Sequence, residues 1–239
     1  MIKFLVAAGV AASLVAPLAA RAQPAPSGQT APGTSSAAPA APAAPAEHVR
    51  VDGFRSAKWG MSEAEVKSAI VADFKIPGDK LKAETNPSEK TAIVNIAVPE
   101  LIERAGIARI SYIFGYASKK LIQVNIVWGT PADPQAKPEM VVAAANQLRQ
   151  LFSEEGYEPS TVVTSARAPD GGIIVFQGQD ADKHTTLLRL LSAQAPAEKD
   201  GKGEKDKEKD KPQTQTALFL SYVMDSANPD IYRLKKGQF

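Results

Sequence analysis

The stretch IARISYIFGYASKKLIQVNIVW, residues 107–128, decides the fold class of this chain. Apolar side chains recur at every second position in both of its parts, and this period of two is typical of strands with one apolar face. The first set is Ala108, Ile110, Tyr112, Phe114 and Tyr116, and the second is Ile122, Val124, Ile126 and Trp128. The short polar connection between them, residues 117–120, therefore predicts a β-hairpin.

Two amphipathic segments on either side of the hairpin predict helices. Ser62 with Glu65 three residues later has the spacing of a capping box, and apolar residues then recur at helical intervals until Pro77. Residues 138–155 carry a second apolar stripe, which ends before Gly156. The members of that stripe are Val141, Ala144, Ala145, Leu148, Leu151 and Phe152. A sheet with one apolar face needs such helices to cover it.

Further runs predict more strands, and short turns separate most of them. These runs are residues 91–98, 160–166, 173–177, 184–191 and 216–224. Short turns allow antiparallel pairing and exclude parallel pairing. The sequence thus predicts an α+β domain: a single twisted antiparallel sheet with two helices packed on one face. It shows no repeat of fixed period.

The amino-terminal segment predicts export. Lys3 precedes an apolar run, residues 4–20, and Ala20-Arg21-Ala22 has the small-x-small pattern of a signal-peptidase site. We expect a signal peptide over residues 1–22, with cleavage near Ala22 and a periplasmic or secreted product. The alternative, an uncleaved anchor, needs about 20 apolar residues, and this run is shorter and contains Pro17.

Two other segments differ in composition from the predicted domain, residues 49–239. Residues 23–48 are rich in Pro and Ala, which is typical of an extended and disordered linker. This linker is either a spacer or a leader without a role of its own. Residues 197–214 contain a run of mixed lysines and acids, which predicts a disordered charged loop between two strands.

Composition narrows the possible functions. The chain has 28 Lys plus Arg and 26 Asp plus Glu, and removal of the signal peptide takes away Lys3 and Arg21 and leaves no net charge. A neutral protein has no global attraction for nucleic acid or for an anionic membrane. The chain has no cysteine, which excludes a lipid-anchored lipoprotein, thiol catalysis and thiolate metal sites.

Few residues are candidates for chemistry. His48 lies at the end of the linker, and the simplest interpretation of His184 is a surface histidine at the shoulder of a hairpin. Asp180 and Asp182 have the spacing of a calcium loop but lack its other ligands. Trp59 and Trp128 indicate either core aromatics or a recognition site. We predict no catalytic, cofactor-binding or metal residue.

The motif Phe54-x-x-x-x-Trp59-Gly60-Met61-Ser62-x-x-x-Val66, followed by the hairpin, resembles the opening of small exported bacterial domains. The group is similar in outline to the outer-membrane assembly lipoprotein BamE and the β-lactamase inhibitory protein, whose α/β units are binding modules. The resemblance implies an α+β fold and a bacterial envelope setting. The chain departs from BamE because it lacks the lipidation cysteine.

The expected function is that of an exported, non-enzymatic binding module. Its partner would be an envelope protein or a cell-wall component, not nucleic acid, and no membrane span would remain after cleavage. An edge strand that accepts a strand from the partner is the expected surface. The alternatives are an envelope hydrolase that uses carboxylates and a small-ligand carrier with a cavity lined by Trp128 or Tyr112.

Overall fold

The computed structural model describes residues 48–194, 214–234 and 237. The predicted signal peptide, the linker apart from His48, and most of the charged loop lie outside these residues. His48 is exposed. No helix among the described residues is long and apolar enough to cross a bilayer.

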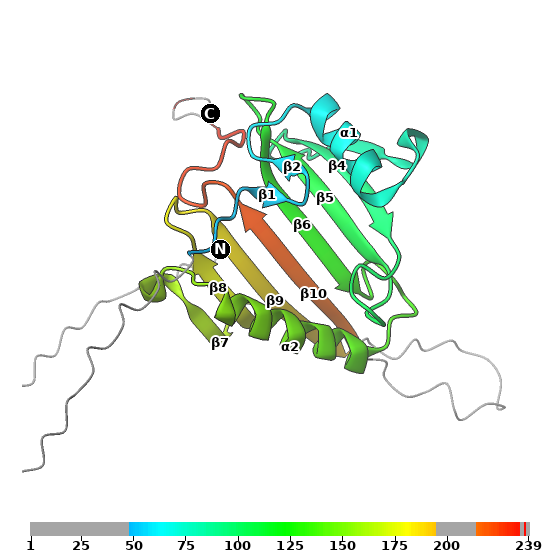
Figure 1. Cartoon of the computed structure of the whole chain (residues 1–239), viewed down its shortest axis with the longest axis vertical. Coiled ribbons are helices and arrows are strands. Elements are labelled where there is room, and N and C mark those ends of the chain that lie inside the picture. Colours follow the sequence, from blue (N-terminus) through cyan, green and yellow to red (C-terminus); the bar gives the residue numbers. More distant parts are fainter. Residues whose placement is uncertain (1–47, 195–213, 235–236, 238–239) are drawn as a thin grey trace, which may run out of the picture. The chain divides into compact units, whose positions relative to one another are not determined.

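The domain is built on one antiparallel sheet of eight strands (Figure 1), which confirms the predicted fold class. Its strands are β3 (Lys82–Thr85), β4 (Ala92–Val98), β5 (Ala108–Phe114), β6 (Leu121–Gly129), β7 (Val163–Arg167), β8 (Ile173–Gln179), β9 (Thr185–Gln194) and β10 (Thr214–Val223). They lie in the order β3-β4-β5-β6-β10-β9-β8-β7. A separate pair, β1 (Gly53–Phe54) and β2 (Ala57–Lys58), forms a small second sheet.

Two helices, α1 (Glu63–Phe74) and α2 (Pro138–Glu154), cover the same face of the sheet (Figure 1). The alternate side chains of the central strands point toward them and form the core. Tyr112, Phe114 and Trp128 are among the largest fully buried residues. The hairpin that the sequence predicts is the β5–β6 pair.

The predicted capping box at the start of α1 is present. The Ser62 hydroxyl accepts a hydrogen bond from the Glu65 amide at 3.4 Å, and the Glu65 carboxylate accepts one from the Ser62 amide at 2.7 Å. These bonds satisfy amide groups that a helix start would otherwise leave without partners. The hydrogen bonds from Ser62 also lower the pKa of Glu65.

The two halves of the sheet repeat one order of elements. The first half runs α1, a short 3-10 helix η1 (Gly78–Lys80), then β3 to β6; the second runs α2, η2 (Pro159–Thr161), then β7 to β10. In each half the first strand lies at an edge of the sheet and the following strands lie progressively closer to its centre. The last strands of the two halves, β6 and β10, pair antiparallel at the centre. A twofold axis normal to the sheet would generate this arrangement.

Equivalent positions of the two halves lie 81 residues apart over a long stretch. η1 and η2 begin at Gly78 and Pro159, and β4 and β8 begin at Ala92 and Ile173. The sequence shows no repeat because equivalent strands differ in composition: β4 is AIVNIAV and β8 is IIVFQGQ, which agree at two of seven positions. The two halves therefore repeat the order and spacing of their helices and strands but not their amino-acid sequence.

Four sequence predictions need correction. β3 was not predicted, because all four of its residues are exposed and it lacks an apolar alternation. Tyr116 is not on the core face, since β5 ends at Phe114 and the chain turns at Gly115. Leu151 belongs to the exposed side of α2, and Thr214 belongs to β10 instead of the charged loop.

Candidate functional site

The fold leaves open the face of the sheet opposite the helices. Among the described residues no helix lies on this face. Six strands each present three alternate residues here: Ile93, Asn95 and Ala97; Arg109, Ser111 and Ile113; Gln123, Asn125 and Val127; Phe219, Ser221 and Val223; Thr185, Leu187 and Arg189; Ile174, Gln177 and Gln179. We call these eighteen residues the open face.

The open face is neutral over most of its area and mixes aliphatic, amide and hydroxyl groups. Among these eighteen residues Arg109 and Arg189 are charged, and Arg189 forms an ion pair with Asp170. Lys82 and Glu84 of the edge strand β3, which pair with Asn95 and Ile93, lie on the same side of the sheet. A row of short polar side chains crosses its middle, where the Ser111 hydroxyl bonds the Asn95 amide oxygen at 2.5 Å. Beside that row, Val127 pairs with Phe219 across the two central strands.

The size of the open face suits a protein partner. Six strands spaced about 4.8 Å apart and about seven residues long, at about 3.3 Å per residue, cover roughly 700 Å². A stable protein interface buries about 800 Å² on each partner. Most of its side chains are half-buried, because neighbours in a sheet shield one another.

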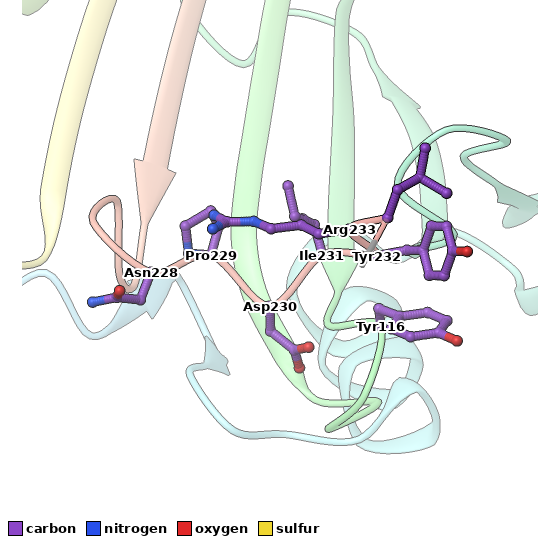
Figure 2. Close-up of a pocket in the computed structure, with 8 residues that line it drawn as sticks. Tyr116, Asn228, Pro229, Asp230, Ile231, Tyr232 and Arg233 are labelled. Atoms are coloured by element: carbon purple, nitrogen blue, oxygen red, sulfur yellow. The ribbon is translucent and has the colours of Figure 1, made fainter. Parts of the chain in front are cut away.

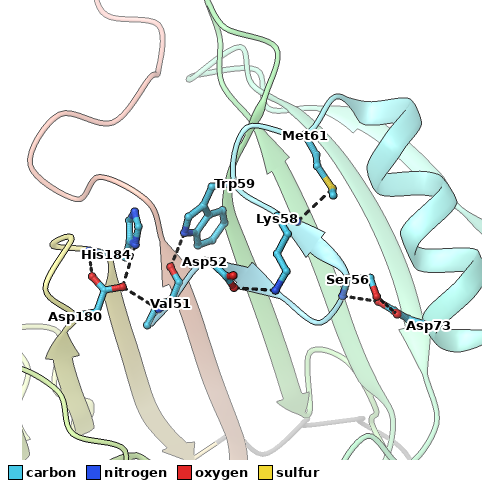
Figure 3. Close-up of polar contacts among 9 residues, drawn as sticks. All are labelled: Val51, Asp52, Ser56, Lys58, Trp59, Met61, Asp73, Asp180 and His184. Atoms are coloured by element: carbon cyan, nitrogen blue, oxygen red, sulfur yellow. Dashed lines mark hydrogen bonds and ion pairs between the residues drawn. The ribbon is translucent and has the colours of Figure 1, made fainter. Parts of the chain in front are cut away.

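A second cluster surrounds His184 at the β8–β9 turn (Figure 3). The Asp180 carboxylate is fully buried and accepts bonds from the amides of Val51 and His184, each at 2.8 Å. The His184 Nδ1 lies 3.0 Å from the same carboxylate. His184 lies at the hairpin turn, as the sequence predicts, but its imidazole is only 17 % exposed and is therefore largely buried.

This cluster has a structural role that its contacts explain. Asp180 joins the amino-terminal segment at Val51 to the second half of the sheet, and Trp59 donates a hydrogen bond from its indole to the Val51 carbonyl at 2.7 Å. Possible ligand atoms of Asp180, Asp182 and His184 lie within 4.8 Å of one another. The Asp180 oxygens, however, already accept the amide bonds, which leaves this set poorly suited to a cation.

The structure separates the two tryptophans. Trp128 is 1 % exposed in the core, whereas Trp59 is half-buried beside the His184 ring. Trp128 and Tyr112 are surrounded by packed side chains, and burial raises the pKa of the Tyr112 phenol. The Tyr112 hydroxyl and the Trp128 indole N–H are buried without a hydrogen-bond partner among the described residues, so the small-ligand carrier stays a prediction.

The carboxy-terminal segment forms a third site, where it folds back on the β5–β6 turn (Figure 2). The Asp230 carboxylate accepts hydrogen bonds from the Ala117 and Ser118 amides, each at 2.9 Å. Tyr232 packs edge-on against Tyr116, with 5.3 Å between ring centroids, beside a cavity of about 640 Å³. The carboxy-terminal segment supplies most of the residues that line this cavity. We therefore interpret these contacts as those that hold the segment against the β5–β6 turn.

The two edge strands, which the sequence analysis favours as a surface, differ in their protection. β3 presents Lys82 and Glu84, and charged side chains on an edge disfavour the addition of another strand. β7 is uncharged from Val163 to Ala166 but is interrupted by Ser165, whose φ of 55° lies in the left-handed region. Neither edge is a long regular strand.

Comparison with known proteins adds no family to this description. No protein-family model, no curated protein and no solved structure matches the chain. The resemblance to exported bacterial binding modules therefore remains a prediction.

Proposed function

We propose that this protein is an exported, non-enzymatic module that binds another protein of the bacterial envelope through the open face. The observation that carries the proposal is a six-strand surface, large enough for a protein interface and free of covering helices among the described residues. The export signal over residues 1–22 and the resemblance to exported binding modules support the envelope setting.

The composition of the open face defines the chemistry of the partner. The centres of stable protein interfaces are depleted in charge and contain aromatic and aliphatic anchors within a polar surround. Phe219 lies next to the polar middle row, between Arg189 and Val127, and Val127 is only 7 % exposed. Arg109 lies on the far side of Val127. The partner should therefore present an apolar group that contacts Phe219, within a polar surround.

The enzyme alternative receives no support from the histidines. His48 is exposed at the boundary of the described residues, and His184 is bonded to a structural carboxylate. The Nδ1–Asp180 contact leaves Nε2 as the ring nitrogen that would have to reach a substrate proton, so the turnover of a His184→Ala variant tests the enzyme alternative.

A pair of matched variants tests the proposal in cells. The natively exported chain with Phe219→Ala loses the aromatic anchor of the open face, and Leu151→Ala removes an apolar side chain that is 49 % exposed on α2. After in-cell crosslinking, the wild type and Leu151→Ala should give the same dominant adduct. Phe219→Ala should give roughly thirtyfold less, since an aromatic anchor contributes about 2 kcal/mol or more.

Two outcomes would contradict the proposal. One is recovery of the wild-type chain alone; the other is an adduct that Phe219→Ala leaves unchanged. A thermal denaturation curve for each variant shows whether loss of the adduct is due to unfolding.

A further inference from the structure

A groove separates α2 from the edge strand β7, on the helix-bearing side of the sheet. Its volume is about 410 Å³, which lies in the range of ligand-binding sites. Ala145 and Val142 of α2 form one wall, and Val175 and Leu190 of the sheet contribute to the lining. Ile173, also in the lining, is 46 % exposed, so the groove leaves apolar surface in contact with solvent.

The charges around this groove are of one sign. Arg149 from α2 and Arg167 from β7 are the only charged residues of the lining. Neither guanidinium forms an ion pair within the described part of the chain. Asp170, in the turn after β7, is engaged by Arg189 instead. The groove therefore favours an anionic group attached to an apolar one.

The groove also offers groups that bond a peptide backbone. The ladder between β7 and β8 is interrupted at Ser165 and Val175, and both residues line the groove. The Asn146 amide and the Ser165 hydroxyl add a donor and an acceptor beside the apolar wall. A fatty acid would use the apolar wall and the arginines but not these polar groups.

We propose that this groove is a second binding site, distinct from the open face, and that it takes an acidic peptide segment. The aliphatic side chain of the peptide packs between Val142 and Leu190. A neighbouring side-chain or terminal carboxylate pairs with Arg149 and Arg167, whose planar guanidinium groups suit two-point binding of a carboxylate.

The test uses the purified exported chain and a library of random heptapeptides, selected at low salt. The double variant Arg149→Glu/Arg167→Glu reverses the charge of the groove, and Arg109→Glu makes the same change on the open face. Selected peptides should carry an acid within two residues of an aliphatic side chain. The double variant should bind them at least about tenfold more weakly, and Arg109→Glu should bind them as the wild type does.

Raising the salt concentration should weaken binding, because the guanidinium groups lie at the surface. A variant Ile173→Ser should also bind more weakly, since it removes exposed apolar lining. The absence of any selected peptide, or peptides without an acid, or equal binding by the double variant would overturn the proposal. Binding that appears only after deletion of residues 198–211 would also overturn it, because the chain's own loop would then be the occupant. Since Arg109→Glu changes only the open face, the two proposals can fail separately.

Discussion

The two halves of this domain share one topology but reach stability by different means. The first half is covered by α1, a 12-residue helix with a complete capping box and two buried aliphatic residues, Val66 and Ile70. The second is covered by α2, which has 17 residues, no side-chain cap and an aromatic cluster beneath its end. Two halves with the same topology can therefore be stabilised by different side-chain contacts. The groove between helix and edge strand described above lies in the second half.

The largest difference between the halves should appear when the aromatic cluster is removed. Phe152 lies 5.5 Å from the Phe176 ring and 6.4 Å from the rings of Tyr157 and Tyr222, measured between centroids. Phe152→Ala should lower the free energy of unfolding by about 3–5 kcal/mol, measured by chemical denaturation. Val66→Ala in α1 should lower it by about 2 kcal/mol. An equal loss in both variants would show that the halves are stabilised alike.

The carboxy-terminal segment tests whether the first half depends on the end of the chain. Asp230→Ala removes the acceptor for two amides of the β5–β6 turn, and hydrogen exchange at Ala117 and Ser118 should speed up about tenfold. Unchanged exchange would mean that the segment is held by its tyrosines alone.

Lowering the pH should break the same hydrogen bonds between Asp230 and the β5–β6 turn. The Ser118 hydroxyl and the Ala117 and Ser118 amides favour the ionised carboxylate, which lowers the pKa of Asp230 below its ordinary value of 3.8. The stabilisation is therefore complete above pH 3.8 and is lost as the pH falls through the lower pKa of the folded state. Amide exchange at Ala117 followed across this range should show the loss in the wild type and no such transition in Asp230→Ala.

The helix starts provide a smaller contrast. Ser62→Ala should destabilise the protein by about 1 kcal/mol, because it breaks the capping box. Lys137, which precedes α2, makes no side-chain cap, and Lys137→Ser should stabilise the protein by up to about 1 kcal/mol. Thermal denaturation of both variants should therefore show shifts of opposite sign. Shifts of the same sign would mean that the caps are not what distinguishes the two helix starts.

The smallest effect is expected in the loop between β9 and β10. Deletion of residues 198–211 should leave the domain folded, because closing a loop depends weakly on its length, by about 0.6 kcal/mol per doubling. The melting temperature of the deletion variant measures this. A collapse of the fold would show that the second half needs this segment.

The sequence predicts the fold class because the apolar period of two in β5 and β6 and the signals at Ser62 and Gly156 depend on local chemistry. It misses β3, whose exposed residues carry no apolar pattern, and it misses the repeat of the two halves, because equivalent strands differ in composition. The position of His184 at a turn was predicted, but not its contact with Val51 through Asp180, which joins residues 129 positions apart. The open face depends on strand order, which no local pattern reports.

Site-specific photo-crosslinking is the most direct test of binding through the open face. A photo-reactive amino acid at Ser221, in the middle of the open face, is compared with one at Gln147 on the exposed side of α2, each in the natively exported chain. If the partner binds through the open face, Ser221 should give one dominant adduct and Gln147 should give none of that mass. Adducts of equal yield from both positions, or an adduct from Gln147 alone, would contradict it.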